Sequence, residues 1–181
     1  MRPGELQQAA RILRAGGLVA YPTEYCFGLG CDPCKRDTVL RLLRLKRRPV
    51  AKGLILIAAD VSQVMSYVEN IPEKVLASWP GPHTWLLEPR AGVPGWITGQ
   101  HPRIAVRITA HPMAAALCKA AGMAIVSTSA NRGGGVPART DREVVRLFGK
   151  EIDFVVSGMV GAAPAPTPIR DAVTGELVRP G

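Results

Sequence analysis

The sequence predicts a single α/β domain, 1–181, built on a twisted, open, mixed β-sheet with flanking helices. Its 181 residues, 47% of them hydrophobic, suffice for one sizeable core and are too few for two ordinary domains. Short apolar runs of buried-strand type and helical segments follow one another without strict alternation, which favours a mixed sheet over a barrel. No internal repeat is present.

The first elements lead to a polar strand end. Residues 6–13 have the spacing of an amphipathic helix that stops at a glycine pair, and the apolar run 18–21 then predicts a strand. A proline ends this strand, so Thr23 and Glu24 are expected at its end, where open α/β sheets place ligands. The glycine-rich stretch 28–30 is interpreted as a turn.

A second helix is predicted from Asp37, whose side chain can cap it, to the proline at 49. Leucines form its apolar stripe, and the interleaved basic residues are expected to face solvent. These basic residues are Arg41, Arg44 and Lys46. The remaining elements follow from the same patterns. They are strands at 54–58, 83–87, 104–108, 123–126, 152–156 and 176–179, helices at 60–68, 72–79 and 111–121, a helix opened by the capping box Thr140/Glu143, and a mobile loop at 158–168.

Charge and composition restrict the function classes. The net charge of +9 and the pI near 10.0 predict a field that attracts polyanions such as nucleotides or nucleic acid. The few aromatic residues do not form the clustered signature of a base-stacking RNA module. No secretory signal or membrane-spanning run is present, so a cytoplasmic location without membrane contact is expected, with the four cysteines as free thiols.

Four cations occur within seven residues, at 46–52. Lys46, Arg47, Arg48 and Lys52 flank a proline, and the apolar strand that follows fixes Lys52 at a strand entrance. A fixed cation cluster beside two strand ends suggests a phosphate site. The alternative is a solvated helix end, where positive charge suits the helix dipole.

Two further groups of residues suggest a ligand. Ser127, Ser129 and Asn131 alternate along an extended segment that leads into a glycine loop, so their side chains can serve one ligand. Arg107 lies inside the apolar run 104–108, and an inward-pointing arginine must meet an anion. Each has an ordinary alternative, which is a polar turn for the trio and a solvent-facing side chain for Arg107.

Several common devices are missing from the sequence. Cys31 and Cys34 form a lone C-x-x-C, and a tetrahedral zinc site would need two more ligands, so no protein-held metal is expected. There is no G-x-S-x-G elbow, no G-x-x-x-x-G-K-[ST] loop and no complete dinucleotide fingerprint. Any nucleotide must therefore be held by another arrangement.

Taken together and in order, the segments YPTEYCFGLGCDP, LKRRPVAKGLILIA, WPGPHTW, AVRITAHP, VSTSAN and IRDAVTGELVRPG resemble the YrdC-like threonylcarbamoyl-AMP synthases. The resemblance covers nearly the whole chain. Its most specific part is the K-x-R pair Lys46/Arg48 followed by the S-x-N pair Ser129/Asn131. Tyr25 and Ile57 depart from residues common in the family, as does the glycine loop at 132–137.

The resemblance implies a twisted open sheet with a concave basic groove, and synthesis of L-threonylcarbamoyl-AMP and pyrophosphate from L-threonine, bicarbonate and ATP. This product feeds threonylcarbamoyladenosine formation at position 37 of tRNA, through downstream transfer proteins. By the same resemblance, the catalytic residues are Lys46, Arg48, Ser129 and Asn131. Further ATP-binding residues are Lys52, Arg103, Arg170 and Arg179, and the threonine site comprises Thr23, Tyr25, Arg107, Ser127 and Thr167. Mg²⁺ is expected with ATP, held largely by phosphate oxygens and water.

Two other readings remain open. A non-catalytic RNA-binding or tRNA maturation factor could use the same basic groove, and direct RNA binding is compatible with either activity. A carbamoyl-transfer domain related to hydrogenase maturation proteins would share the fold, although such proteins carry further domains.

Overall fold

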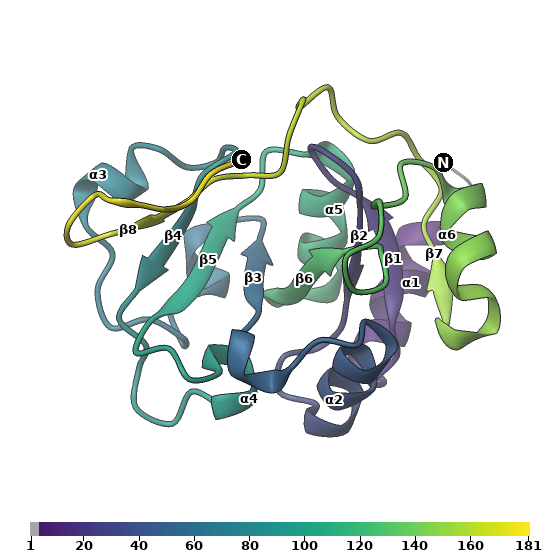
Figure 1. The fold of residues 1–181 in the computed structure, drawn as a ribbon, viewed down its shortest axis with the longest axis horizontal. Coiled ribbons are helices and arrows are strands. Elements are labelled where there is room, and N and C mark those ends of the chain that lie inside the picture. The colour runs from purple at the N-terminus through teal and green to yellow at the C-terminus, as the bar shows by residue number, and fades with distance from the viewer. Residues whose placement is uncertain (1–3) are drawn as a thin grey trace.

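The computed structural model describes residues 4–181, which form one nine-stranded mixed sheet (Figure 1). The strand order is β7-β1-β2-β6-β3-β5-β4-β8-β9. The strands are β1 (Val19–Pro22), β2 (Phe27–Gly30), β3 (Ile55–Ala58), β4 (Thr84–Leu87), β5 (Ile104–Ile108), β6 (Ile125–Ser129), β7 (Phe154–Val155), β8 (Ile169–Asp171) and β9 (Leu177–Arg179). Pairings β1–β7, β3–β5 and β4–β8 are parallel and the others are antiparallel. The expected mixed sheet is confirmed.

Helices cover both faces of this sheet. The helices are α1 (Glu5–Arg14), α2 (Arg36–Leu45), α3 (Glu73–Leu76), α4 (Gly95–Thr98), α5 (Pro112–Ala121) and α6 (Asp141–Phe148), with 3₁₀ turns at Val50–Lys52, Val61–Gln63 and Gly149–Glu151. Apolar residues of α1 and α5 pack together with Val19, Ile57 and Ile125 in one buried cluster. A larger cluster on the other face takes in α2, α4 and α6.

Most of the predicted elements are present, and the capping box of α6 is formed by both of its hydrogen bonds. Three expectations are wrong. Asp37 does not cap α2, because the helix begins one residue earlier, after a turn in which Asp32 accepts the backbone N–H of Cys34. Segment 60–68 holds only a 3₁₀ turn, whose start is capped by Asp60. The third wrong expectation is a turn at residues 28–30. In addition, β8 was not predicted.

The stretch 28–30 is not a turn but part of β2, paired antiparallel to β1. Its glycines are required by close packing, since the fully buried ring of Tyr21 lies against both Gly28 and Gly30. A Cβ atom at Gly30 would lie 2.6 Å from the carbonyl oxygen of Val126. Glycine here permits a close approach within the sheet rather than a change of chain direction.

We expect Gly30→Ala to lower the free energy of unfolding by about 1–3 kcal/mol, because neither the backbone nor the Tyr21 ring can yield easily. Urea denaturation measures this change. Gly95→Ala is the matched control, since a Cβ atom there meets nothing within 4 Å. Equal destabilisation by the two substitutions would contradict the packing argument.

Candidate functional site

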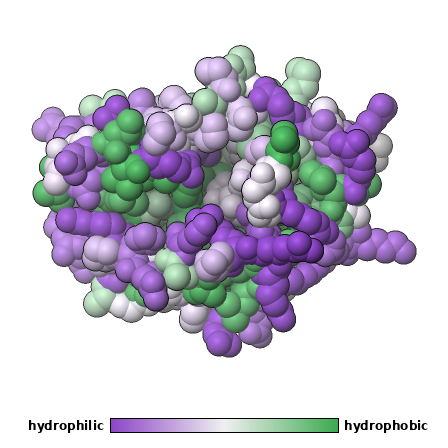
Figure 2. All heavy atoms as spheres, in the orientation of Figure 1, coloured by the Kyte–Doolittle hydropathy of each residue, from purple (hydrophilic) through white to green (hydrophobic). Residues whose placement is uncertain are grey.

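A cavity of about 180 Å³ lies where the C-terminal ends of β1 and β6 meet the start of β3, beside β5. Figure 2, in the orientation of Figure 1, shows a hollow near the middle of the visible face, bordered by strongly hydrophilic residues. The cavity lining comes from the β1–β2 turn, the five strands β2, β3, β5, β6 and β9, the loops after α2 and β6, and the segment between β7 and β8. These residues are Thr23, Glu24, Tyr25, Cys26, Phe27, Gly28, Arg48, Leu54, Ile55, Arg107, Ser127, Thr128, Ser129, Pro137, Pro166, Thr167 and Arg179.

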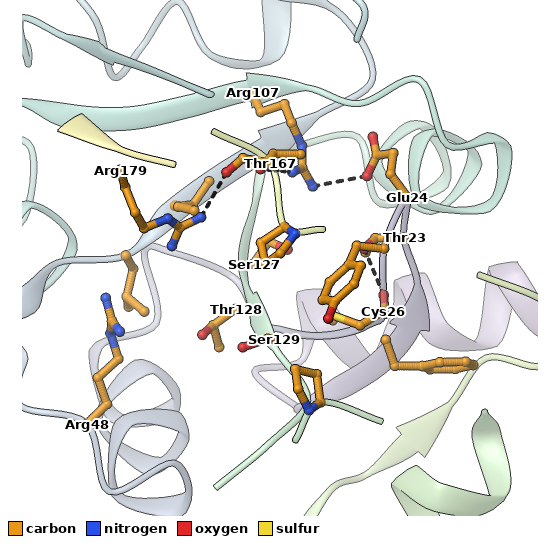
Figure 3. Close-up of a pocket in the computed structure, with 17 residues that line it drawn as sticks. Thr23, Glu24, Cys26, Arg48, Arg107, Ser127, Thr128, Ser129, Thr167 and Arg179 are labelled. Atoms are coloured by element: carbon orange, nitrogen blue, oxygen red, sulfur yellow. Dashed lines mark hydrogen bonds and ion pairs between the residues drawn. The ribbon is translucent and has the colours of Figure 1, made fainter. Parts of the chain in front are cut away.

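Arg107 lies at one end of the cavity (Figure 3). Strand alternation sends Ile104 and Val106 into the larger hydrophobic cluster and turns Arg107 to the opposite side. Its side chain is 8% exposed, and Nη1 donates a hydrogen bond of 2.7 Å to Oγ1 of Thr167. The expected inward orientation is confirmed, and the solvent-facing alternative is wrong.

Glu24 is the carboxylate that faces Arg107. Its Oε2 lies 3.2 Å from Nη2 of Arg107, and its Oε1 accepts a hydrogen bond of 2.7 Å from Thr109. Burial alone would raise the pKa of Glu24, but the charge of Arg107 and the Thr109 hydroxyl outweigh burial and hold this pKa below its ordinary value. Glu24 is therefore ionised at neutral pH and leaves Arg107 partly neutralised.

Arg48 and Arg179 form a second cationic group on the other side of Ser127 (Figure 3). Arg48 donates to the carbonyl oxygens of Lys52 and Gly53, and Arg179 donates to that of Thr167 at 3.0 Å. Burial lowers the pKa of Arg48, and the charge of Arg179 lowers it further. Two guanidinium groups near enough to repel one another indicate a place that an anion would stabilise.

The helical pattern predicted that Lys46 faces solvent, and this prediction is wrong. It is 5% exposed, because α2 ends at Leu45 and Arg47 adopts a left-handed conformation with φ 51° that turns the chain. The Lys46 ammonium donates to the backbone carbonyl of Ser129 and to both oxygens of Asn131, at 2.8 and 3.0 Å for the latter. Lys46 thus holds the end of β6 in place from behind the cavity lining.

The serine and asparagine trio is only partly brought together. Ser127 and Ser129 line the cavity from β6, whereas Asn131 lies beyond the strand and is absent from the lining. Asn131 accepts from Ser129 Oγ at 2.7 Å and donates to the carbonyl of Gly135 at 2.6 Å. Its amide organises the loop that follows β6 and also fixes the Ser129 hydroxyl.

The threonine-site residues named from the sequence all line the cavity. The Thr23 hydroxyl donates to the carbonyl of Cys26, and the ring of Tyr25 packs under the guanidinium of Arg139, 5.2 Å from its centroid. Thr167 also contacts the hydroxyl of Thr84 at 3.1 Å. Sequence reasoning did not name Thr128 as a site residue, although it stands between two predicted site serines. The other lining residues that it did not assign to the site are Cys26, Phe27, Gly28, Leu54, Ile55, Pro137 and Pro166.

The remaining ATP-site candidates lie elsewhere. Lys52 and Arg103 line a neighbouring cavity of about 140 Å³, which shares Arg48 and Arg179 with the first. Arg103 forms an ion pair with Asp171, with 3.9 Å between Nε and Oδ2. Arg170 donates to the carbonyl of Gly175 at 3.4 Å and lines neither cavity. The two cavities therefore form one basic depression that extends from β1 to β9.

The segment 158–168, expected as a mobile loop, crosses the site on its way from β7 to β8 (Figure 1). Backbone N–H groups of Gly161 and Ala163 donate to the carbonyls of Thr23 and Glu24, at 2.9 and 3.1 Å. The ring of His111 contacts the carbonyl of Met159 at 3.2 Å. These contacts fasten the segment to the cavity wall and deliver Thr167.

Neither a metal cluster nor a membrane helix is found among residues 4–181. No three His, Cys, Asp or Glu side chains in this range are grouped so that they could hold a metal ion. No helix in the described part of the chain has the length and apolar character needed to cross a membrane.

The chain is an α/β protein with a cavity lined by three arginines, of which Arg107 is buried. The chain belongs to the Sua5/YciO/YrdC family, whose model, described as "Telomere recombination", matches residues 11–181. It is 53% identical over 178 residues to the threonylcarbamoyl-AMP synthase of Methylococcus capsulatus, covering 96% of each chain.

Two solved structures show the same fold. The structure of P. abyssi Sua5 complexed with L-threonine matches with a TM-score of 0.90 and 31% identity, over 97% of this chain. The chain spans only 54% of that Sua5 chain. E. coli YciO matches with a TM-score of 0.83 and 28% identity, over 97% of this chain and 88% of YciO. These matches confirm the fold and the family expected from the sequence.

Proposed function

We propose that this protein is a threonylcarbamoyl-AMP synthase, which makes L-threonylcarbamoyl-AMP and pyrophosphate from L-threonine, bicarbonate and ATP. The observation that carries the proposal is a cavity lined by three arginines from one end to the other. Arg107 stands at one end and Arg48 at the other, and Arg179, which like Arg107 hydrogen-bonds Thr167, lies between them beside the hydroxyls of β6. A ligand with a carboxylate at one end and phosphates at the other, joined through a carbamate, fits this arrangement. The names of similar proteins support the proposal.

The chemistry is adenylyl transfer. The amino group of threonine and bicarbonate form a carbamate, an oxygen of this carbamate attacks the α-phosphorus of ATP, and pyrophosphate leaves. The protein therefore mainly positions two anions and neutralises developing charge. We assign the threonine carboxylate to Arg107 and the phosphates to Arg48, Lys52 and Arg179. The hydroxyls of Ser127 and Ser129 would orient the carbamate between them. Arginines suit this role, whether buried like Arg107 or more exposed like Arg48 and Arg179, because their guanidinium groups stay charged.

Lys46 and Asn131 act on this chemistry indirectly in our proposal. They fix the backbone at the end of β6 and the Ser129 hydroxyl, through the hydrogen bonds described above. Tyr25 and Thr23 would contact threonine, as would Thr167, which already bonds Arg107. Arg103 contributes from the neighbouring cavity, and Arg170 only through the β8–β9 hairpin.

Mg²⁺ would enter with the triphosphate as part of the substrate. Among the described residues that line the cavity, Glu24 is the one with a carboxylate, and this group already contacts Arg107 and Thr109. Phosphate oxygens and water would therefore supply most of the ligands for the ion. We further propose a cytoplasmic role in which the adenylate passes to proteins that transfer threonylcarbamoyl to tRNA.

Incubation with ATP, Mg²⁺, labelled bicarbonate and L-threonine tests the proposed reaction. We expect pyrophosphate release that depends on threonine and bicarbonate, with the label recovered in an adenylate. Arg48→Ala should reduce this rate about ten- to a hundred-fold, since one charge-assisted contact contributes roughly 1.5–3 kcal/mol. RNA binding without any threonine-dependent pyrophosphate release would instead favour the non-catalytic RNA-binding alternative.

A further inference from the structure

The pair formed by Arg107 and Glu24 is incomplete. Within residues 4–181, the buried atoms Arg107 Nε and Glu24 Oε2 have no hydrogen-bond partner. Oε2 has only the ion-pair contact of 3.2 Å with Nη2 of Arg107. The two side chains are 8% and 12% exposed, and both belong to the cavity wall. Buried polar groups are nearly always paired in folded proteins, so this donor and this acceptor indicate a missing partner.

The chemistry of that partner follows from the two atoms. Arg107 offers a cationic N–H donor, and Glu24 offers an anionic acceptor beside it. A simple carboxylate or phosphate would satisfy Arg107 but would be repelled by Glu24. A group that carries an anion and a cation on neighbouring atoms satisfies both, and the α-carbon of a zwitterionic amino acid carries such a pair.

We propose that Glu24 binds the amino group of the amino-acid substrate and so makes the cavity specific for α-amino acids. This inference rests on the proposed function and adds a residue to its threonine site. The substrate carboxylate would take up the free donor of Arg107 while the ammonium donates to Oε2 of Glu24. When bicarbonate carbamoylates this nitrogen, one of its hydrogens leaves in water and one as a proton to solvent. The nitrogen retains one N–H, so the same contact persists in the product.

The surroundings of Glu24 suit this role. Thr109 donates to Oε1, and the N–H of Ala163 fastens the backbone carbonyl of Glu24 itself, so the carboxylate is held in one orientation. Oε2 remains the oxygen for a ligand. The competing explanation is that Glu24 only positions Arg107, in which case removing its charge would affect every ligand carboxylate alike.

Calorimetric titration with two ligands separates these explanations. One ligand is L-threonine, and the other is 3-hydroxybutanoate, which keeps the carboxylate and hydroxyl but has hydrogen in place of the amino group. We expect the wild-type protein to bind threonine at least about ten-fold more tightly. Glu24→Gln should weaken threonine binding about ten-fold or more and leave 3-hydroxybutanoate binding unchanged or stronger. Glu88→Gln, at an exposed glutamate outside the cavity, is the control.

Equal weakening of both ligands in Glu24→Gln would overturn the inference in favour of a positioning role. Equal affinity of the wild-type protein for the two ligands would also overturn it, even if the variant did not fold. The proposed function fails separately, if threonine binds with the expected preference but drives no pyrophosphate release. A protein that does not bind threonine would contradict both.

Discussion

Arg107→Lys is expected to raise the KM for threonine about ten- to a hundred-fold while leaving ATP affinity nearly unchanged. The planar guanidinium can contact a carboxylate at two points and still bond Thr167, which the single ammonium of lysine cannot reproduce. Losing one charge-assisted contact costs roughly 1.5–3 kcal/mol, which gives the stated range. The measurement is a threonine titration at saturating ATP beside an ATP titration without threonine.

Lysine keeps the positive charge opposite Glu24, so the substitution does not leave a buried carboxylate unpaired. Arg107→Ala would do so and would lose about 3–5 kcal/mol of stability, which would confuse the result. Arg90→Lys is the matched control, because Arg90 is exposed and its ion pair with Glu69 lies outside the cavity. An equal loss in the threonine and ATP titrations would reassign Arg107 to the nucleotide.

Lys46→Met should lower the free energy of unfolding by roughly 3 kcal/mol and also reduce activity. Three oxygen atoms at the end of β6 and just after it lose a charged donor, and hydrogen bonds to charged groups contribute about 1.5–3 kcal/mol each. The cost of burying the ammonium, which also lowers its pKa, offsets part of this sum at pH 7. Methionine retains most of the side-chain volume, so cavity formation adds little. Urea denaturation measures the stability, with Lys119→Met at an exposed helix position as the control.

The effect of pH on the same variant provides an independent check. Burial lowers the pKa of Lys46 to about 8, and the charge of Arg48 contributes to this shift. The unfolded chain, with a pKa near 10.4, therefore binds more protons than the folded chain above pH 8, so this group makes stability rise with pH in that window. The stability difference between wild type and Lys46→Met should be larger at pH 9.5 than at pH 7. No change would mean that Lys46 keeps an ordinary pKa.

Local patterns predicted whatever depends on neighbouring residues. The alternation of 104–108 was enough to orient Arg107, because a strand turns successive side chains to opposite faces. The proline that ends β1 likewise placed Thr23 and Glu24 at a strand end. Both features lie within a few residues of the signal that predicted them.

Long-range packing accounts for the errors. Lys46 was assigned to the solvent-exposed face of a helix, but it lies just past the last helical residue and contacts the end of β6 and the loop after it, 83 and 85 residues away. Gly28 and Gly30 read as a turn because nothing local reveals the Tyr21 ring packed against them. The role of Glu24 was invisible for the same reason, since it depends on Arg107 and Thr109, which are distant in sequence.

The order of the strands has a consequence for synthesis on the ribosome. Residues up to Ser129 already contain the six contiguous strands β1-β2-β6-β3-β5-β4, whereas β7, β8 and β9 add to the two outer edges afterwards. Because nascent chains fold from the N-terminus, the central sheet can assemble before the residues that complete the cavity have been made. Thr167 and Arg179 arrive last, so a nascent chain can acquire its core well before it can hold both ends of a substrate.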